Sequence, residues 1–245
     1  MIYEYNFQVD DLSVDRFGRL KLSCVLFAAQ EAAARHSALL GTGQNDLDEK
    51  NLFWAVTRHK VQITKLPQLG QTIRVQTWPM PTTRTAYPRA VVALDEAGQE
   101  LFRVISLWVL MDKDRRALVL PGKSGVNVDG AVLGGELAVP HSLMPRAFPR
   151  YAERTVTYSC LDRNGHMNNT RYLDWVEDLL SSDFHRTHPA RGITLCYASE
   201  ALESEVLRLD WELSEAGTLQ VDGHRVQTSE AGKQTRVFAA EVVYG

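Results

Sequence analysis

The stretch LDRNGHMNNTRYLDW, residues 161–175, places three polar side chains on alternate positions directly before an amphipathic segment. These side chains belong to Asp162, Asn164 and His166. Apolar residues then recur at helical spacing, and acidic residues take the opposite side. The apolar positions are Tyr172, Leu173, Val176, Leu179 and Leu180. The stretch therefore predicts a polar turn that leads into a helix with one buried face.

A second copy of this pattern lies near the start of the chain. Residues 15–20 read DRFGRL and residues 162–167 read DRNGHM, so both share the frame Asp-Arg-x-Gly-x-apolar. A helical pattern follows the first copy as well, with Leu22, Val25, Leu26, Ala29, Ala33 and His36 on one side. Strand-like segments follow each helix: TIRVQTW, RAVVAL and LFRVISLWVLM, then VLRLDWEL, TLQVDG and TRVFAAEVV. The chain is thus predicted to be an α+β protein that repeats one unit.

Glycine and proline mark the joints between these segments. Residues 121–147 are rich in both and lack periodicity, which is typical of a linker. We therefore predict an N-terminal domain over residues 1–120 and a C-terminal domain over residues 148–245. Hairpin turns are predicted at Glu96–Gly98, Ser214–Gly217 and Ser229–Gly232.

Composition narrows the function classes. The chain has 245 residues, of which 44% are hydrophobic, so it can fill a globular core. A net charge of −3 gives no sequence-wide attraction to nucleic acid or to anionic lipid. The three cysteines are widely spaced, which favours a reducing cytoplasm over a disulfide framework. We expect no export signal, no membrane span, no metal and no cofactor.

Ordered blocks in both halves carry a resemblance to a known family. They are Gln30–Glu31, Leu52–Ile63, Arg89, Ser106–Pro121, residues 161–175 and Tyr197-x-x-Glu200. Over nearly its whole length the chain resembles the acyl-ACP thioesterases of plants and bacteria. The resemblance implies two tandem hot-dog domains, each a long helix wrapped by an antiparallel sheet. It also implies hydrolysis of the thioester between a fatty acyl chain and acyl carrier protein (ACP).

The family's proposed catalytic set would transfer onto Asp162, Asn164, His166 and Glu200. Plant members commonly have a cysteine after the glutamate, where this chain has Ala201. They also have basic residues just before the glutamate, where this chain has Ala198 and Ser199. The first departure argues against a cysteine nucleophile, so we discount Cys160 and Cys196 as catalysts.

Thioester hydrolysis needs an activated water and a place for the charge that develops on the carbonyl oxygen. Backbone N–H groups at the start of the second helix, together with the Asn164 amide, could hold that oxygen. Glu200, expected on the strand after the helix, is the candidate general base. His166 could bind the carboxylate or the water. Asp162 could orient Asn164 or only hold the turn, and Asn168 and Asn169 are expected to begin the helix.

The first copy lacks these polar residues. It has Phe17 and Arg19 in place of Asn164 and His166, and Lys65–Pro67 near the position of Glu200. We therefore assign catalysis to the second unit and acyl-chain binding to the first. The candidate lining residues are Ala29, Ala33, Trp54, Val56, Trp108 and Leu110. The small residues of the first helix could equally serve tight packing of helix on sheet.

An acidic carrier protein should meet basic residues. The candidates are Lys113, Arg115, Arg116 and Arg150, and each could also be an ordinary solvated charge. Two alternatives stay open: an acyl-CoA thioesterase with the same fold, and a noncatalytic acyl-binding module. A homodimer is also open, because outer sheet edges could pair.

Overall fold

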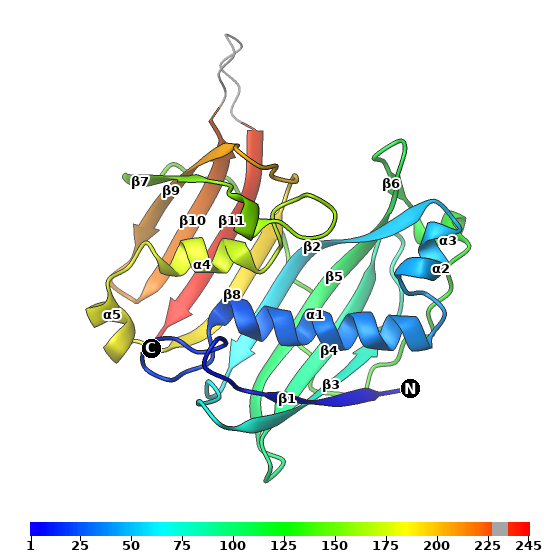
Figure 1. Cartoon of the computed structure of the whole chain (residues 1–245), viewed down its shortest axis with the longest axis horizontal. Coiled ribbons are helices and arrows are strands. Elements are labelled where there is room, and N and C mark those ends of the chain that lie inside the picture. Colours follow the sequence, from blue (N-terminus) through cyan, green and yellow to red (C-terminus); the bar gives the residue numbers. More distant parts are fainter. Residues whose placement is uncertain (227–234) are drawn as a thin grey trace. The chain divides into compact units, whose positions relative to one another are not determined.

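The computed structural model describes residues 1–226 and 235–245. The chain divides into two compact units, Met1–Pro140 and His141–Gly245. Each unit places a helix across one face of an antiparallel sheet (Figure 1). The predicted turn at Ser229–Gly232 lies outside the described residues.

The first unit is built on a sheet in the order β1-β3-β4-β5-β2, and β6 pairs with β5. All of its strand pairs are antiparallel. The strands are β1 (Tyr3–Gln8), β2 (Leu52–Ile63), β3 (Thr72–Pro79), β4 (Tyr87–Leu94), β5 (Glu100–Asp112) and β6 (Leu118–Val119). The helices are α1 (Leu22–Leu39), α2 (Gln44–Asp48) and α3 (Pro121–Ser124). The predicted turn at Glu96–Gly98 joins β4 to β5.

Helix α1 lies on this sheet through the apolar side that its sequence predicts. Its buried residues are Leu22, Ser23, Val25, Leu26, Ala28, Ala29, Ala32, Ala33 and His36. Each fully buried valine or leucine side chain contributes about 1.5–3 kcal/mol. Ala34, in contrast, is exposed, because it falls on the opposite side of the helix.

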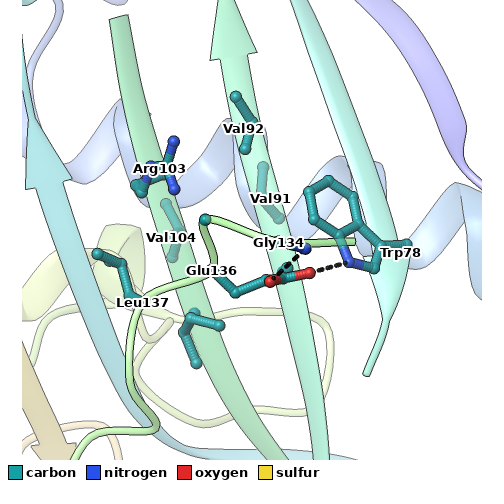
Figure 2. A pocket seen from close by; sticks show the side chains of 11 residues that line it. Trp78, Val91, Val92, Arg103, Val104, Gly134, Glu136 and Leu137 are labelled. Atoms are coloured by element: carbon teal, nitrogen blue, oxygen red, sulfur yellow. Dashed lines mark hydrogen bonds between the residues drawn. The ribbon is translucent and has the colours of Figure 1, made fainter. Parts of the chain in front are cut away.

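Residues 121–140 fold back onto the first unit. Near their start, Ser124 Oγ lies 2.9 Å from the Tyr87 hydroxyl. Near their end, the Glu136 carboxylate accepts the Gly134 N–H at 2.9 Å and the Trp78 indole N–H at 3.3 Å. Figure 2 shows Glu136 between Gly134 and Trp78, over the strands that carry Val91 and Val104. The later contacts hold residues 134–136 against the sheet face opposite α1.

The second unit has a sheet in the order β8-β11-β10-β9-β7, with antiparallel pairs throughout. Its strands are β7 (Arg150–Thr155), β8 (Ala190–Tyr197), β9 (Val206–Leu213), β10 (Thr218–Arg225) and β11 (Thr235–Tyr244). Its helical segments are η1 (Tyr158–Cys160), α4 (Arg171–Glu177) and α5 (Ser182–Thr187). The predicted turn at Ser214–Gly217 joins β9 to β10.

Helix α4 is shorter than its periodicity predicts. It has seven residues, and Leu179 and Leu180 follow its end as half-buried side chains. Contacts between aromatic rings hold the helix against the sheet. The ring centroid of Tyr172 lies 4.7 Å from that of Phe238 on β11 and 5.5 Å from that of Tyr197 on β8. The short helix α4 therefore packs on its sheet through a few large aromatic rings, whereas the longer α1 packs through many smaller residues.

The duplication predicted from the sequence extends to the hydrogen bonds of the turn before each helix. Asp15 Oδ1 accepts the Phe17 N–H at 2.8 Å, and Asp162 Oδ1 accepts the Asn164 N–H at 2.8 Å. The glycine of each copy has a positive φ, 75° and 77° respectively. Such angles are easy only for glycine, so the shared frame encodes one turn used twice.

Two histidines of the first unit are buried on the α1 side of its sheet. His36 accepts a hydrogen bond from Arg89 at 3.1 Å, and His59 Nδ1 lies 2.9 Å from Ser106 Oγ. Burial, helped by the Arg89 charge, lowers the pKa of His36 to about 4. Burial lowers the pKa of His59 to about 3. Both imidazoles are therefore neutral in the folded protein.

We expect the first unit to lose stability as pH falls from about 6.5 toward 4. The unfolded chain takes up protons on these histidines, near their ordinary pKa of about 6.5, while the folded protein does not. The unfolding free energy should fall by at most about 1.4 kcal/mol per pH unit for each histidine. Urea unfolding between pH 7 and 5 measures this slope.

The His59→Gln variant should be less stable at pH 7 but should show a shallower slope. His188→Gln is the control, because His188 is exposed. Equal slopes for wild type and His59→Gln would contradict the expectation.

Candidate active site

The turn at residues 161–167 projects the predicted polar residues from a rigid frame. Besides binding the Asn164 N–H through its carboxylate, Asp162 donates its own N–H to the His166 carbonyl at 2.8 Å. Leu161 and Met167 form a β-bridge across the turn. Asp162 thus holds the turn, as Asp15 does in the first unit.

The structure brings His166 and Glu200 together. His166 Nε2 lies 3.2 Å from Glu200 Oε2. The backbone sets this meeting, because the Met167 N–H donates to the Ala201 carbonyl at 2.8 Å and His166 forms a β-bridge with Leu202. The side chain of His166 is 22% exposed and that of Glu200 is 44% exposed. A pair that touches yet faces solvent can meet both a water molecule and a substrate.

The sequence predicted Glu200 on a strand, but it does not lie on one. Strand β8 ends at Tyr197, and Glu200 follows in a turn. The alternation of β8 stops there because the Ala198 and Ser199 N–H groups both bond to the Val237 carbonyl. Glu200 therefore lies beyond the end of β8, beside the turn that carries His166.

Asn164 is exposed, and its side-chain amide forms no hydrogen bond within the part of the chain that the structure describes. Its backbone is nevertheless fixed by Asp162. A fixed backbone with a free amide suits a donor that waits for a substrate oxygen.

Asn168 and Asn169, expected to begin the helix, lie in the turn just before α4, which begins at Arg171 with Thr170 as its N-cap. Asn168 Oδ1 accepts the Thr170 N–H at 2.9 Å and its hydroxyl at 2.8 Å, which is the behaviour of a helix cap. The Asn169 carbonyl accepts the Tyr197 hydroxyl at 2.7 Å, and burial raises the pKa of that hydroxyl. Because the Asn168 side chain occupies the Thr170 N–H, this donor is not available to an oxyanion.

The corresponding place in the first unit is apolar. The Leu20 N–H donates to the Pro67 carbonyl at 2.8 Å, just as Met167 donates to Ala201. Leu66 therefore stands where Glu200 stands, and it is only 8% exposed. Arg19, at the place of His166, forms an ion pair with Asp15 at 2.8 Å. The first unit keeps the frame without the acid-imidazole pair.

Cysteine does not enter this constellation. Cys24, Cys160 and Cys196 are all free thiols. Cys196 precedes Tyr197 on β8, so it points to the face opposite the one that carries Tyr197 and α4. Its sulfur lies 3.7 Å from the His141 carbonyl. This arrangement supports a structural role for Cys196.

The candidate acyl-chain residues lie on one side of the first sheet. Trp54, Trp108 and Leu110 pack with residues of α2 and of the segment after α3, namely Leu47, Leu52, Tyr87 and Val126. Val56 pairs with Trp108 across β2 and β5 and is buried. On α1, Ala29 and Ala33 are buried. The six residues thus belong to the interior of the first unit.

The candidate carrier-binding residues come from both units. Lys113, Arg115 and Arg116 lie in the turn between β5 and β6, and Lys113 forms an ion pair with Asp48 at 2.5 Å. Arg115 and Arg116 are exposed. Arg150 begins β7, where its guanidinium lies 5.0 Å from the Trp211 ring centre.

Sequence reasoning missed two residues beside Glu200. Arg225, at the end of β10, donates to the Glu200 carbonyl at 2.7 Å and forms an ion pair with Glu205 at 2.9 Å. No periodicity or motif connects either residue with Glu200, and Arg225 lies 25 residues after it. Only their charges distinguish them from their neighbours, so the signal was too weak to find them.

Neither a metal site nor a membrane-spanning helix appears among the described residues. No group of three or more histidine, cysteine or acidic side chains there could hold a metal ion. No helix in residues 1–226 and 235–245 is long and apolar enough to cross a bilayer.

Solved structures resemble the chain over its full length. An acyl-ACP thioesterase from Bacteroides thetaiotaomicron is 23% identical, with a TM-score of 0.88, covering 100% of this chain and 98% of that one. The 12:0-ACP thioesterase of Umbellularia californica is 22% identical, with a TM-score of 0.81, covering 100% and 97%. These likenesses confirm the predicted α+β fold of two tandem hot-dog domains.

Similarity to curated sequences points to the same group of proteins. A chloroplastic palmitoyl-acyl carrier protein thioesterase of Gossypium hirsutum is 26% identical over 233 residues, which are 89% of this chain and 56% of the relative. The chain spans about half the length of the curated relatives it matches. Two family models match it, one for the acyl-ACP thioesterase N-terminal domain at residues 1–120 and one for the C-terminal domain at residues 148–240. With two such matches over most of its length, the chain belongs to the acyl-ACP thioesterase family.

Proposed function

We propose that the protein hydrolyses the thioester between a fatty acyl chain and acyl carrier protein, releasing free fatty acid and holo-ACP. The observation that carries the proposal is the 3.2 Å contact between His166 and Glu200, where His166 lies on the same turn as the exposed Asn164. The relatives are named as thioesterases of acyl-ACP, and these names support the choice of substrate.

In the proposed mechanism Glu200 removes a proton from a water molecule, and the water oxygen attacks the thioester carbonyl. His166 orients the carboxylate through the contact at Nε2. The Asn164 amide donates to the oxygen that becomes negative in the tetrahedral intermediate. The intermediate then expels the thiolate of the carrier arm, which takes up the proton from Glu200. Asp162 contributes by holding the turn.

We infer that the first unit binds the acyl chain and that the carrier docks through basic residues. A buried methylene gains about 0.8 kcal/mol, so an apolar interior can retain a long chain. The proposed lining is Ala29, Ala33, Trp54, Val56, Trp108 and Leu110. The proposed carrier contacts are Lys113, Arg115, Arg116 and Arg150. Free thiols at all three cysteines support a reducing compartment such as the cytoplasm, and we propose no cofactor.

Replacing the proposed base should abolish most turnover. We expect Glu200→Gln to lower kcat about 10²- to 10⁴-fold, because the amide cannot accept the proton of water. KM should change little, since Glu200 does not hold the acyl chain. Thiol release from acyl-ACP measures both constants. Glu203→Gln is the control, since Glu203 is an exposed acid of the same turn. Equal kcat values for the two variants would remove Glu200 from the mechanism.

Removing the Asn164 amide should slow the reaction without affecting folding. We expect Asn164→Ala to lower kcat about 10²- to 10³-fold, the usual loss for one donor to an oxyanion. The thermal unfolding temperature should stay near wild type, because the lost group forms no hydrogen bond to the described residues. A kcat within threefold of wild type would show that Asn164 does not contact the oxyanion.

The carrier can be identified by comparing matched substrates. We expect kcat/KM for an acyl-ACP to exceed that for the acyl-CoA of the same chain, because only the protein carrier meets the basic residues. Raising the salt concentration should reduce the difference. Equal values would favour an acyl-CoA thioesterase. Acyl binding without thiol release would favour a noncatalytic binding module.

A further inference from the structure

The main-chain carbonyl of Glu200 is held by a side chain from another strand. Arg225, the last residue of β10, donates from Nη2 to this carbonyl at 2.7 Å. On the next residue, the Ala201 carbonyl accepts the Met167 N–H. Two consecutive carbonyls are thus each held by a hydrogen bond, one from Arg225 and one from Met167. These bonds restrict the backbone from which the Glu200 side chain extends.

Arg225 is itself held in place by Glu205. The two form an ion pair with 2.9 Å between Nε and Oε1, and their side chains are 28% and 23% exposed. The other carboxylate oxygen of Glu205 accepts the Leu202 N–H at 3.0 Å. Glu205 therefore ties the guanidinium to the same turn whose carbonyl it binds. Arg225, Glu205 and the turn at residues 200–205 form a closed loop of contacts.

In the first unit the corresponding carbonyl is held by a residue close in sequence. Its Leu66 carbonyl, at the place of Glu200, accepts a hydrogen bond from the Gln68 side chain two residues away at 3.0 Å. The Gln68 N–H bonds to the Gln71 side chain at 2.7 Å, as Leu202 bonds to Glu205. In the second unit Leu202 replaces Gln68 and cannot donate from its side chain. A charged pair occurs in the unit that carries Glu200.

We propose that Arg225, held by Glu205, is a positioning residue that keeps the carboxylate of Glu200 against His166. The proposal rests on the proposed role of Glu200 as the base. In this proposal Arg225 acts through the backbone of Glu200 and not on the attacking water or the substrate. Since an error of about 1 Å in a reacting group can cost about 100-fold in rate, a loosened turn should be felt mainly in kcat.

The structural alternative is that the ion pair only stabilises the turn. Partly exposed ion pairs contribute little to stability, about 0–1 kcal/mol. Loss of such a pair alone should leave kcat unchanged. Kinetics therefore separates the two roles.

The experiment compares Arg225→Gln and Arg225→Lys with wild type in acyl-ACP hydrolysis. Arg225→Gln should lower kcat about 10- to 100-fold with KM within twofold. Arg225→Lys, which can still donate to the carbonyl, should recover part of the loss. Arg208→Gln is the matched control, because its ion pair with Asp210 has the same 2.9 Å separation but does not contact the Glu200 turn. It should keep wild-type kcat.

A second measurement tests the same proposal without turnover. In protein labelled with ¹⁵N-histidine, Glu200→Gln should change the ring ¹⁵N signals of His166. Arg225→Gln should move these signals in the same direction by a smaller amount, and Arg208→Gln should not move them. His166→Gln assigns the signals. If wild type releases no thiol from any acyl-ACP, the proposed function fails, and this spectrum still decides whether Arg225 positions Glu200.

Two results would overturn the proposal. One is kcat for Arg225→Gln within twofold of wild type together with unchanged His166 signals. The other is a loss of kcat that Arg208→Gln reproduces, since that would reflect general disturbance of the sheet. Thermal unfolding of every variant identifies a protein that fails to fold, and in that case Glu205→Gln, which leaves Arg225 in place, repeats both measurements.

Discussion

One backbone hydrogen bond, from the Met167 N–H to the Ala201 carbonyl, sets the candidate site. It places side by side a turn that carries Asn164 and His166 and a turn that carries Glu200. Partly exposed side chains lose about 1–2 kcal/mol of rotamer entropy when they are ordered, so they meet reliably only where the backbone brings them close. The acid and the imidazole touch because two turns, distant in sequence, are fixed to each other first.

The first unit shows that this frame is independent of the chemistry. It has the same bond between Leu20 and Pro67, but Leu66 fills the position of Glu200 and is buried. The duplicated fold therefore supplies a scaffold, and a few side chains decide whether it holds a reactive pair. In the first unit this position holds the buried Leu66, which is shielded from water. In the second unit it holds the partly exposed carboxylate of Glu200, which water can reach.

The sequence predicted the features that depend on local pattern. The repeated turn, the helices and most strands follow from glycine position and apolar spacing. The match with Asp15 made a turn role one of the two alternatives for Asp162. Features that depend on tertiary contact were missed. The length of α4 is set by where aromatic rings such as Tyr172 meet the sheet, and the end of β8 is set by a shared carbonyl on β11. Arg225 reaches Glu200 only after β10 has folded.

The placement of Arg225 also satisfies a constraint on the proposed base. A guanidinium bonded directly to a carboxylate favours its ionised form and weakens it as a base. Arg225 instead contacts the main-chain carbonyl of Glu200 and pairs its charge with Glu205. The turn thereby gains a rigid support from Arg225 through the main chain of Glu200. The Glu200 carboxylate contacts His166 at 3.2 Å and, in the proposed mechanism, accepts the proton of water.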